Sequence, residues 1–357
     1  MIDLDDVKKI IELQSGNLVI KSIDNLPQQL KQSLEESYEV EFPEDYKKIS
    51  SVVVCGMGGS RFPSYIIKEL FKEQFTVPYL FNDDYDLPGF IDHNTLIILS
   101  SYSGTTEEVL VCGEKAVEKG AKICGLTAGG DLKLFLEKNK FPYYLINPVY
   151  NPSGQPRIGF GYFFGGQLGM VLKLGLIRED KEKVEQAINS LSLLIKNFKI
   201  DVKKNNNSIK QLAEKIYQKY PYYIVSEFLT GVGNSIANQT NETAKSISAF
   251  RIIPELNHHL MEGLKYPDKL KEILTFVFFF SKLYSPKIQK RFSITKEIVE
   301  KNSIQTIWYE LEGKNKIEQT LELMAIGSYL SMYLSVLYEQ DPKVIPYVDY
   351  FKERLKE

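Results

Sequence analysis

The stretch Ser51-Val-Val-Val-Cys-Gly56-Met-Gly58-Gly59-Ser60 decides the fold, because an apolar run passes directly into a Gly/Ser loop. A second stretch, Thr95-Leu-Ile-Ile-Leu-Ser100-Ser101-Tyr102-Ser103-Gly104-Thr105-Thr106, repeats this pattern. Each predicts a buried strand that ends in a loop of small residues and continues as a helix. Free backbone N–H groups at such a helix N-terminus bind anions. The two loops together therefore predict one phosphate held from two neighbouring strand ends.

Each loop also has a purely structural explanation. The glycines at 56, 58 and 59 suit a tight turn between strand and helix, and their spacing matches neither a Lys-containing P-loop nor a dinucleotide fingerprint. The hydroxyls of residues 101–106 suit a helix N-cap, but they are more numerous than one cap needs. The two loops considered together favour a phosphate or another small anion.

The composition excludes several functional classes. The chain has 357 residues, of which 43% are hydrophobic, and a formal net charge of −2, so it is long enough for two domains and lacks the basic character of a nucleic-acid-binding protein. The apolar run around 273–280 is too short to span a membrane, and no signal-peptide pattern opens the chain. Three cysteines without metal-site spacing predict a cytoplasmic protein with reduced thiols and no metal.

Strands and helices alternate twice along the chain, after an amphipathic helical segment (1–48) that we expect to pack on the outside. The first series has predicted strands at 51–55, 77–81, 95–99, 121–126 and 142–146, followed by a Pro/Gly-rich bridge at 147–161. The second has strands at 222–226 and 249–253, and the stretches 272–284, 304–309 and 317–337 continue the alternation. This pattern predicts an α/β protein with parallel sheets covered by helices. We expect one domain at 1–200 and another at 208–357, joined by the polar run Lys203–Ser208.

Histidine is scarce, which makes its positions informative. His93 precedes a strand in a turn and is expected to be structural. His258 and His259 follow the strand 249–253, at the strand end where α/β sheets bind ligands, although a solvent-exposed turn is the alternative. Glu242 lies in a helix-like segment rich in amides and hydroxyls, but composition alone does not separate it from Glu227, Glu255 and Glu262.

At these residues the chain resembles the sugar isomerase (SIS) superfamily and, within it, the bifunctional phosphoglucose/phosphomannose isomerases. The resemblance extends from about residue 51 to residue 357. It rests on motifs in a fixed order: Gly56–Ser60, Ser101–Thr106, Asn241–Lys245, Pro254–His259 with Glu262-Gly263, and Val348–Lys352. It implies a homodimer of chains with two SIS-type domains, each a flavodoxin-like αβα sandwich around a five-stranded parallel sheet.

The resemblance also implies a role for each motif. The sugar phosphate would be bound by Gly59, Ser60, Ser101, Ser103 and Thr106. Arg157, after the Pro-rich bridge, would sit near the sugar, and Lys352 would approach the ring oxygens. Glu242 would be the catalytic base, and His258 would open and close the sugar ring. In a dimer, this histidine can be contributed by the partner subunit.

The implied reaction is the interconversion of glucose 6-phosphate, and with less support mannose 6-phosphate, with fructose 6-phosphate through a cis-enediol. One carboxylate can move the proton between C1 and C2, so neither a metal nor a cofactor is expected. One alternative is a non-catalytic sugar-phosphate sensor, but the acidic N-terminal segment has no basic recognition helix. Another is an amino-sugar-phosphate isomerase or deaminase, but an N-terminal glutaminase cysteine is missing.

Three positions depart from the family pattern. Arg61 follows the Gly-Gly-Ser motif where relatives commonly have a small residue, and we expect it to add a phosphate contact or to narrow the access to the site. Thr105 stands where Asn is frequent. The segment Asp341-Pro-Lys-Val-Ile-Pro346 replaces a Thr-Pro sequence near Lys352, which weakens the expectation for mannose 6-phosphate more than for glucose 6-phosphate.

Overall fold

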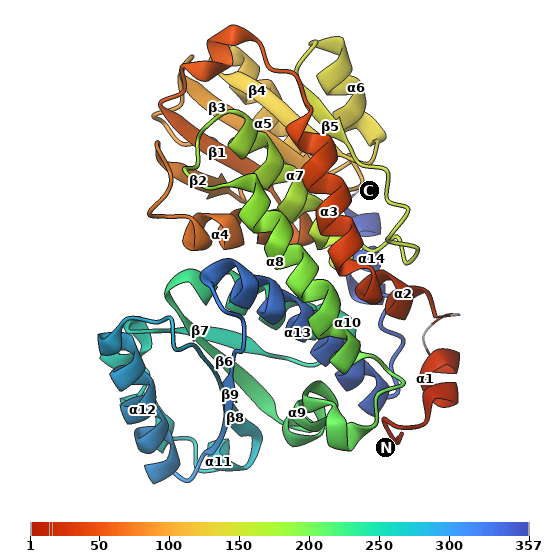
Figure 1. Ribbon diagram of the computed structural model, residues 1–357, viewed down its shortest axis with the longest axis vertical. Helices are drawn as coiled ribbons and strands as arrows, with labels where there is room; N and C mark the ends of the chain where they lie inside the picture. Colours follow the sequence, from red (N-terminus) through yellow and green to blue (C-terminus); the bar gives the residue numbers. More distant parts are fainter. Residues whose placement is uncertain (1, 14, 16, 356–357) are drawn as a thin grey trace.

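Two parallel sheets lie one above the other along the long axis of the molecule (Figure 1) in the computed structural model, which describes residues 2–13, 15 and 17–355. The first sheet has the strand order β2-β1-β3-β4-β5, with all neighbours parallel. Its strands are β1 (Ser51–Gly56), β2 (Tyr79–Asn82), β3 (Thr95–Ser101), β4 (Lys122–Thr127) and β5 (Tyr143–Leu145). These are the five predicted strands, with ends that differ by one or two residues.

The first sheet is buried on both faces, which explains its continuous apolar strands. Every residue of β1 and β3 is buried. Successive side chains point to opposite faces of a strand, so Val52 and Val54 belong to one apolar core and Val53 and Cys55 to another. Helices therefore cover both sides of this sheet, as the alternation of strands and helices predicted.

The helices associated with the first half of the chain precede, interrupt and follow this sheet. They are α1 (Val7–Leu13), α2 (Leu18–Asp24), α3 (Leu26–Tyr38), α4 (Gly58–Leu70), α5 (Glu107–Glu118), α6 (Gly130–Lys138), α7 (Phe160–Lys173) and α8 (Lys181–Leu194). Those of the second half are α9 (Ser208–Ile216), α10 (Thr230–Ala244), α11 (Leu270–Ile273), α12 (Pro286–Lys301), α13 (Lys316–Leu337) and α14 (Pro346–Arg354).

The second sheet has four strands among the described residues, so the expectation of five strands in each domain is wrong. Its order is β7-β6-β8-β9, all parallel. The strands are β6 (Tyr220–Ser226), β7 (Ala249–Ile253), β8 (Leu274–Phe280) and β9 (Gln305–Glu310). After β9 the chain enters α13 and then α14, so up to residue 355 no segment remains for a fifth strand.

Helix α13 is the central helix of the second half. Its length and composition would suffice to cross a membrane, but the whole of its apolar stretch is buried inside the protein. Residues all around the helix are buried, including Glu322 and Gln319. A helix that is apolar on every side and covered on every side is a core helix.

The N-terminal segment packs on the outside of the first domain, as expected, and also reaches the second. Helix α3 packs closely along α7, where the hydroxyls of Ser33 and Ser37 donate to the carbonyls of Gly161 and Gly165. Nearer the N-terminus, the Asp5 carboxylate accepts a hydrogen bond of 3.1 Å from Nζ of Lys210, a fully buried residue of α9. The polar run expected to act as a linker is therefore an ordered connection, bound to Asp5 through the backbone N–H of Lys204.

Candidate active site

The two predicted phosphate loops touch each other at the carboxyl ends of β1 and β3. The backbone N–H of Tyr102 donates to Ser60 Oγ at 3.1 Å, and Ser100 Oγ donates to the Ser60 carbonyl at 2.9 Å. Gly104, with φ +70°, passes so close to the next loop that a Cβ there would overlap the Gly129 carbonyl oxygen. The N-termini of α4 and α5 are therefore adjacent, an arrangement that favours an anion.

The hydroxyls of the second loop form a connected set. Ser101 Oγ lies 2.7 Å from Thr106 Oγ1 and accepts from the backbone N–H of Gly104. Ser103 is exposed and accepts from Thr105. Thr106 occupies the N-cap position of α5, but its side chain accepts no bond from the first turn of the helix. The second loop thus places hydroxyl groups beside the N-terminus of α5, and the Thr106 side chain does not cap that terminus.

Gly59 brings the bridge 147–161 against the first loop. A Cβ at this position would lie 2.8 Å from the Arg157 backbone nitrogen and 2.8 Å from the Pro156 carbonyl carbon. Only glycine allows this approach, because real Cβ atoms do not come so close to backbone atoms. The contact fixes Arg157 beside the first predicted phosphate loop.

We expect Gly59→Ala to displace the bridge, lower the free energy of unfolding by about 1–3 kcal/mol and reduce kcat/KM, because the added methyl group overlaps Pro156 and Arg157. Chemical denaturation and steady-state kinetics measure the two effects. Gly89→Ala is the matched control, since a Cβ at that position would have no other atom within 4 Å. Equal behaviour of the two variants would contradict the role given to this contact.

Arg157 is buried, with 1% of its side chain exposed, and its guanidinium has partners in both halves of the chain. It donates from Nε to Thr243 Oγ1 at 3.2 Å, and from Nη2 to the carbonyls of Pro342 (2.5 Å) and Lys343 (2.8 Å). Nη1 donates to Gln155 and lies 3.8 Å from Glu242 Oε2. The side chain thus connects the bridge, α10 and the segment that leads to α14.

Glu242 lies in the last turn of α10, two residues before the helix ends, with 32% of its side chain exposed. Burial raises the pKa of its carboxyl group, and the positive charges of Arg157, Lys352 and Lys245 oppose that increase. A partly desolvated carboxylate with a raised pKa is suited to accept a proton and return it. The structure therefore brings together two of the predicted residues, Glu242 and Arg157, and the charge of Lys352 acts on Glu242.

Lys245 is a residue of this region to which the sequence analysis gave no role. It ends α10 with φ 54°, and its Nζ donates to the carbonyls of Thr243 (3.2 Å) and Asp341 (2.5 Å). Loss of hydration and the nearby Arg157 lower the pKa of Lys245 to about 8. Its place at the end of the Asn241–Lys245 motif was the available signal.

His258 lies at the opposite end of β7 from Glu242. Helix α10 runs back from the carboxyl end of β6, so Glu242 is near the amino end of β7, whereas His258 follows the carboxyl end of that strand. Five strand residues rise about 16 Å. His258 and His259 are both exposed, and His259 Nε2 lies 2.9 Å from Glu255 Oε2. One chain by itself does not bring His258 to Glu242.

The Arg61 side chain is bound by partners on other elements than the two predicted phosphate loops. Its Nε lies 3.0 Å from Asp83 Oδ2, and Nη1 donates to Asn234 Oδ1 at 2.9 Å. The guanidinium carbon is 4.2 Å from the centre of the Phe81 ring. These partners direct the side chain to the contact between β2 and α10, where it connects the two domains.

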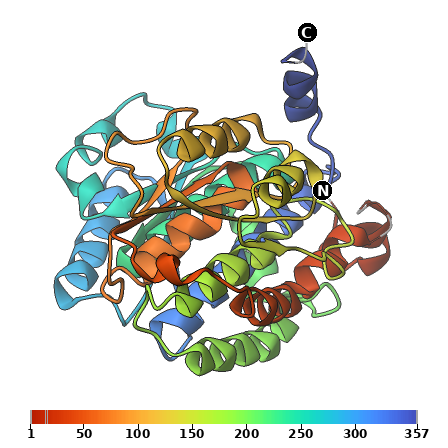
Figure 2. The ribbon, with the colours of Figure 1, turned by 90° about the horizontal axis from the view of Figure 1, so that it is seen from above.

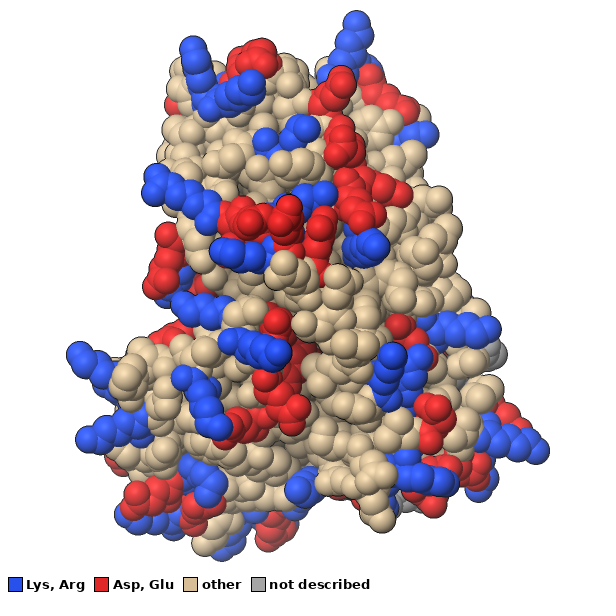
Figure 3. All heavy atoms as spheres, in the orientation of Figure 1, with Lys and Arg blue, Asp and Glu red and all other residues tan. Residues whose placement is uncertain are grey.

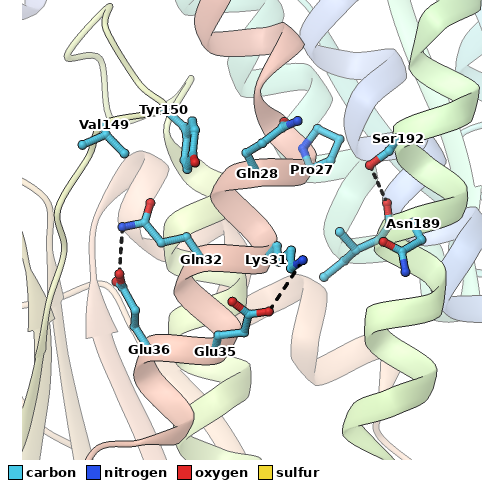
Figure 4. Close-up of a pocket in the computed structure, with 11 residues that line it drawn as sticks. Pro27, Gln28, Lys31, Gln32, Glu35, Glu36, Val149, Tyr150, Asn189 and Ser192 are labelled. Carbon is cyan, nitrogen blue, oxygen red and sulfur yellow. Dashed lines mark hydrogen bonds and ion pairs between the residues drawn. The ribbon is translucent and has the colours of Figure 1, made fainter.

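A groove of about 650 Å³ lies elsewhere, between α3, α8 and the bridge (Figure 4). Its polar side chains largely bind one another: Gln32 donates to Glu36, and Lys31 lies 3.9 Å from Glu35. None of the predicted site residues lines it.

On the face shown in Figure 3, acidic and basic side chains are interspersed rather than gathered in one basic patch. Within residues 2–13, 15 and 17–355, no three His, Cys, Asp or Glu side chains are grouped to hold a metal ion.

Comparison with known proteins supports the relationship that these motifs indicate. The chain is 32% identical to a bifunctional phosphoglucose/phosphomannose isomerase from Caldicellulosiruptor bescii, over 95% of this chain and 99% of that protein. It belongs to this family. A relative with the same name from Aquifex aeolicus is 30% identical over 87% of this chain and 92% of that protein.

A family model agrees with that assignment, and a solved structure shows the same fold. Residues 205–355 match the bacterial phospho-glucose isomerase C-terminal SIS domain. The C-terminal domain of glucosamine-fructose-6-phosphate aminotransferase from Francisella tularensis has a TM-score of 0.68 at 13% identity, covering 90% of this chain and 96% of that structure. The similarity to this solved structure concerns the fold alone. The protein is thus an isomerase of the bifunctional phosphoglucose/phosphomannose isomerase family with the SIS fold.

Proposed function

We propose that this protein interconverts glucose 6-phosphate and mannose 6-phosphate with fructose 6-phosphate through a cis-enediolate, with Glu242 as the base. The observation that carries the proposal is the position of Glu242, 3.8 Å from the buried Arg157, whose backbone lies directly against Gly59 of the first phosphate loop. A carboxylate is thereby placed beside a candidate phosphate site. Family membership supports the same reaction, because the named relatives carry both activities in their names.

In this proposal the two loops hold the phosphate of the sugar. The residues are Gly59, Ser60, Ser101, Ser103 and Thr106, which surround the adjacent N-termini of α4 and α5. Binding the phosphate, which does not react, fixes the position of C1 and C2 relative to Glu242. Sugars without the phosphate are therefore expected to be poor substrates.

The proton moves between C2 and C1 by way of Glu242. The carboxylate removes it from one carbon and returns it to the other, and a hydroxyl proton moves between O1 and O2, so substrate and product differ only in proton positions. Arg157 and Lys352 stabilise the negative charge on the enediolate oxygens. His258 assists ring opening, because imidazole exchanges protons near neutral pH.

We further propose a homodimer in which His258 comes from the partner subunit. The support is geometrical, since His258 and Glu242 of one chain lie at opposite ends of β7. We also propose that the domains divide between residues 200 and 208. The buried free thiols of Cys55, Cys112 and Cys124 support a cytoplasmic location.

A coupled assay of the purified protein tests the proposed function. Glucose 6-phosphate and mannose 6-phosphate are supplied separately, and fructose 6-phosphate formation is followed. Turnover of glucose 6-phosphate alone would exclude the mannose reaction, and absence of turnover with both would refute the proposal. A thermal shift with glucosamine 6-phosphate but not with fructose 6-phosphate would favour an amino-sugar enzyme instead.

A further inference from the structure

The position of helix α14 is set by the residues that precede it. The helix projects from the body of the protein (Figure 2), and none of its residues is buried. It nevertheless carries Lys352, whose positive charge opposes the increase in the pKa of Glu242. Helix α13 ends at Leu337, so residues 338–345 connect the two helices. Since burial of α14 within its own chain does not fix Lys352, this connection has to do so.

Three consecutive backbone carbonyls of the connection are bound by two cationic side chains. Nζ of Lys245 donates to the carbonyl of Asp341 at 2.5 Å. Nη2 of Arg157 donates to the next two carbonyls, those of Pro342 and Lys343. Hydrogen bonds from charged donors are stronger than those between neutral groups. Residues 341–343, which we call the anchored segment, are therefore tied to the body of the protein through their backbone.

Lys245 has a backbone conformation that favours glycine. It follows the last residue of α10 with φ 54°, in the left-handed region where a helix commonly ends in glycine. A side chain with a specific contact explains a lysine at such a position. Its Nζ also donates to the carbonyl of Thr243 at 3.2 Å, and a cation is favoured at a helix C-terminus. Lys245 thus joins the end of α10 to the anchored segment.

We propose that Lys245 is a positioning residue for the isomerase reaction: it holds the anchored segment against the end of α10 and so keeps Lys352 where its charge acts on Glu242. Only two residues separate the segment from Pro346, the first residue of α14. Proline fixes its own φ and restricts the residue before it, so this connection is stiff. The proposal rests on the proposed function, because it is there that Lys352 stabilises the enediolate.

The first test compares two substitutions of Lys245 by steady-state kinetics with glucose 6-phosphate. Lys245→Met removes the charge and the donors, and kcat is expected to fall about 10–100-fold because Lys352 is displaced. KM should change little, since the two loops 56–60 and 100–106 are untouched. Lys245→Arg keeps a charged donor and should retain at least about half of the wild-type kcat. An unchanged kcat in Lys245→Met would overturn the proposal.

The matched control is Lys219→Met, because Lys219 also donates to a distant backbone carbonyl, that of Glu272, at 2.7 Å. It is expected to keep the wild-type kcat. Lys245 is exposed as a residue, so neither of its substitutions is expected to unfold the protein, and circular dichroism checks this point. A similar loss in Lys219→Met would show that the effect is not specific to the anchored segment and would contradict the proposal.

A double variant tests whether Lys245 acts through Lys352. In a Lys352→Met background the group to be positioned is already gone, so adding Lys245→Met is expected to lower kcat by less than about threefold. If the second substitution cost as much in this background as it does alone, the two lysines would act independently and the positioning role would be wrong.

Hydrogen exchange measures the anchor without any activity assay. At short labelling times, peptides covering residues 338–355 are expected to exchange faster in Lys245→Met than in the wild type or Lys219→Met. They include the backbone N–H of Lys343, which donates to Asp341 Oδ1 at 2.7 Å. Exchange that is unchanged in Lys245→Met would overturn the proposal, even with a reduced kcat, because Lys245 would then act without holding the segment.

The same measurement separates this proposal from the proposed function. Faster exchange in Lys245→Met, in a protein that turns over neither aldose phosphate, would refute the isomerase reaction and leave the anchor assigned. An active wild-type protein with unchanged exchange and unchanged kcat in Lys245→Met would refute the anchor and leave the reaction in place.

Discussion

Replacing Glu242 with glutamine is expected to lower kcat by about 10²–10⁴-fold, the usual contribution of a general base. Glutamine has nearly the same shape and keeps an oxygen acceptor, but it does not take up the proton from C2. KM should change little, because the substitution leaves untouched the two loops that we propose bind the phosphate of the substrate. Steady-state kinetics with glucose 6-phosphate and with fructose 6-phosphate measures the loss in both directions.

The matched control for this variant is Glu227→Gln, which makes the same chemical change in the same domain. Glu227 accepts from the backbone N–H of Ser285, a bond that the glutamine oxygen also accepts. It should keep near-wild-type kcat. If Glu242→Gln retained more than about a tenth of the wild-type rate, Glu242 would not be the base. A thermal shift with fructose 6-phosphate confirms that the variant still binds.

The sequence alone was sufficient to predict the first sheet and the contact between the loops 56–60 and 100–106. The continuous burial of β1 and β3 is encoded by apolar runs that have no polar face. The contact of Ser60 with Tyr102 then follows, because β1 and β3 are neighbours and parallel strands end at the same edge. Each of these inferences needs only local pattern and a topological rule.

Other features depended on contacts between distant segments, which a local pattern does not report. Arg61 was expected at the phosphate because of its neighbours in sequence, whereas Asp83 and Asn234, from other elements, determine its direction. The burial of Arg157 likewise depends on carbonyls of Pro342 and Lys343, near the other end of the chain. The fifth strand of the second sheet was inferred from the resemblance and not from a pattern in the residues.

Co-expression of a Glu242→Gln chain with a His258→Ala chain is expected to restore activity that each variant lacks alone. In a mixed dimer with histidine exchange, one site combines both lesions, while the other combines the intact Glu242 of one chain with the intact His258 of its partner. Random pairing makes half of the dimers mixed, so about a quarter of the wild-type site number returns. Distinct affinity tags isolate the mixed dimer for the assay.

The reverse arrangement supplies the control for that experiment. Here a chain with both substitutions is co-expressed with the wild-type chain. If His258 is exchanged, both sites of a mixed dimer are inactive, and only about a quarter of the wild-type activity remains. If His258 is not exchanged, one site of each mixed dimer stays active, and about half of the wild-type activity remains. The same pair made with His259→Ala tests the neighbouring imidazole, which is already 2.9 Å from Glu255. Failure of complementation with both histidines would contradict their exchange between subunits, whereas success with His258 alone would make the partner subunit part of each active site.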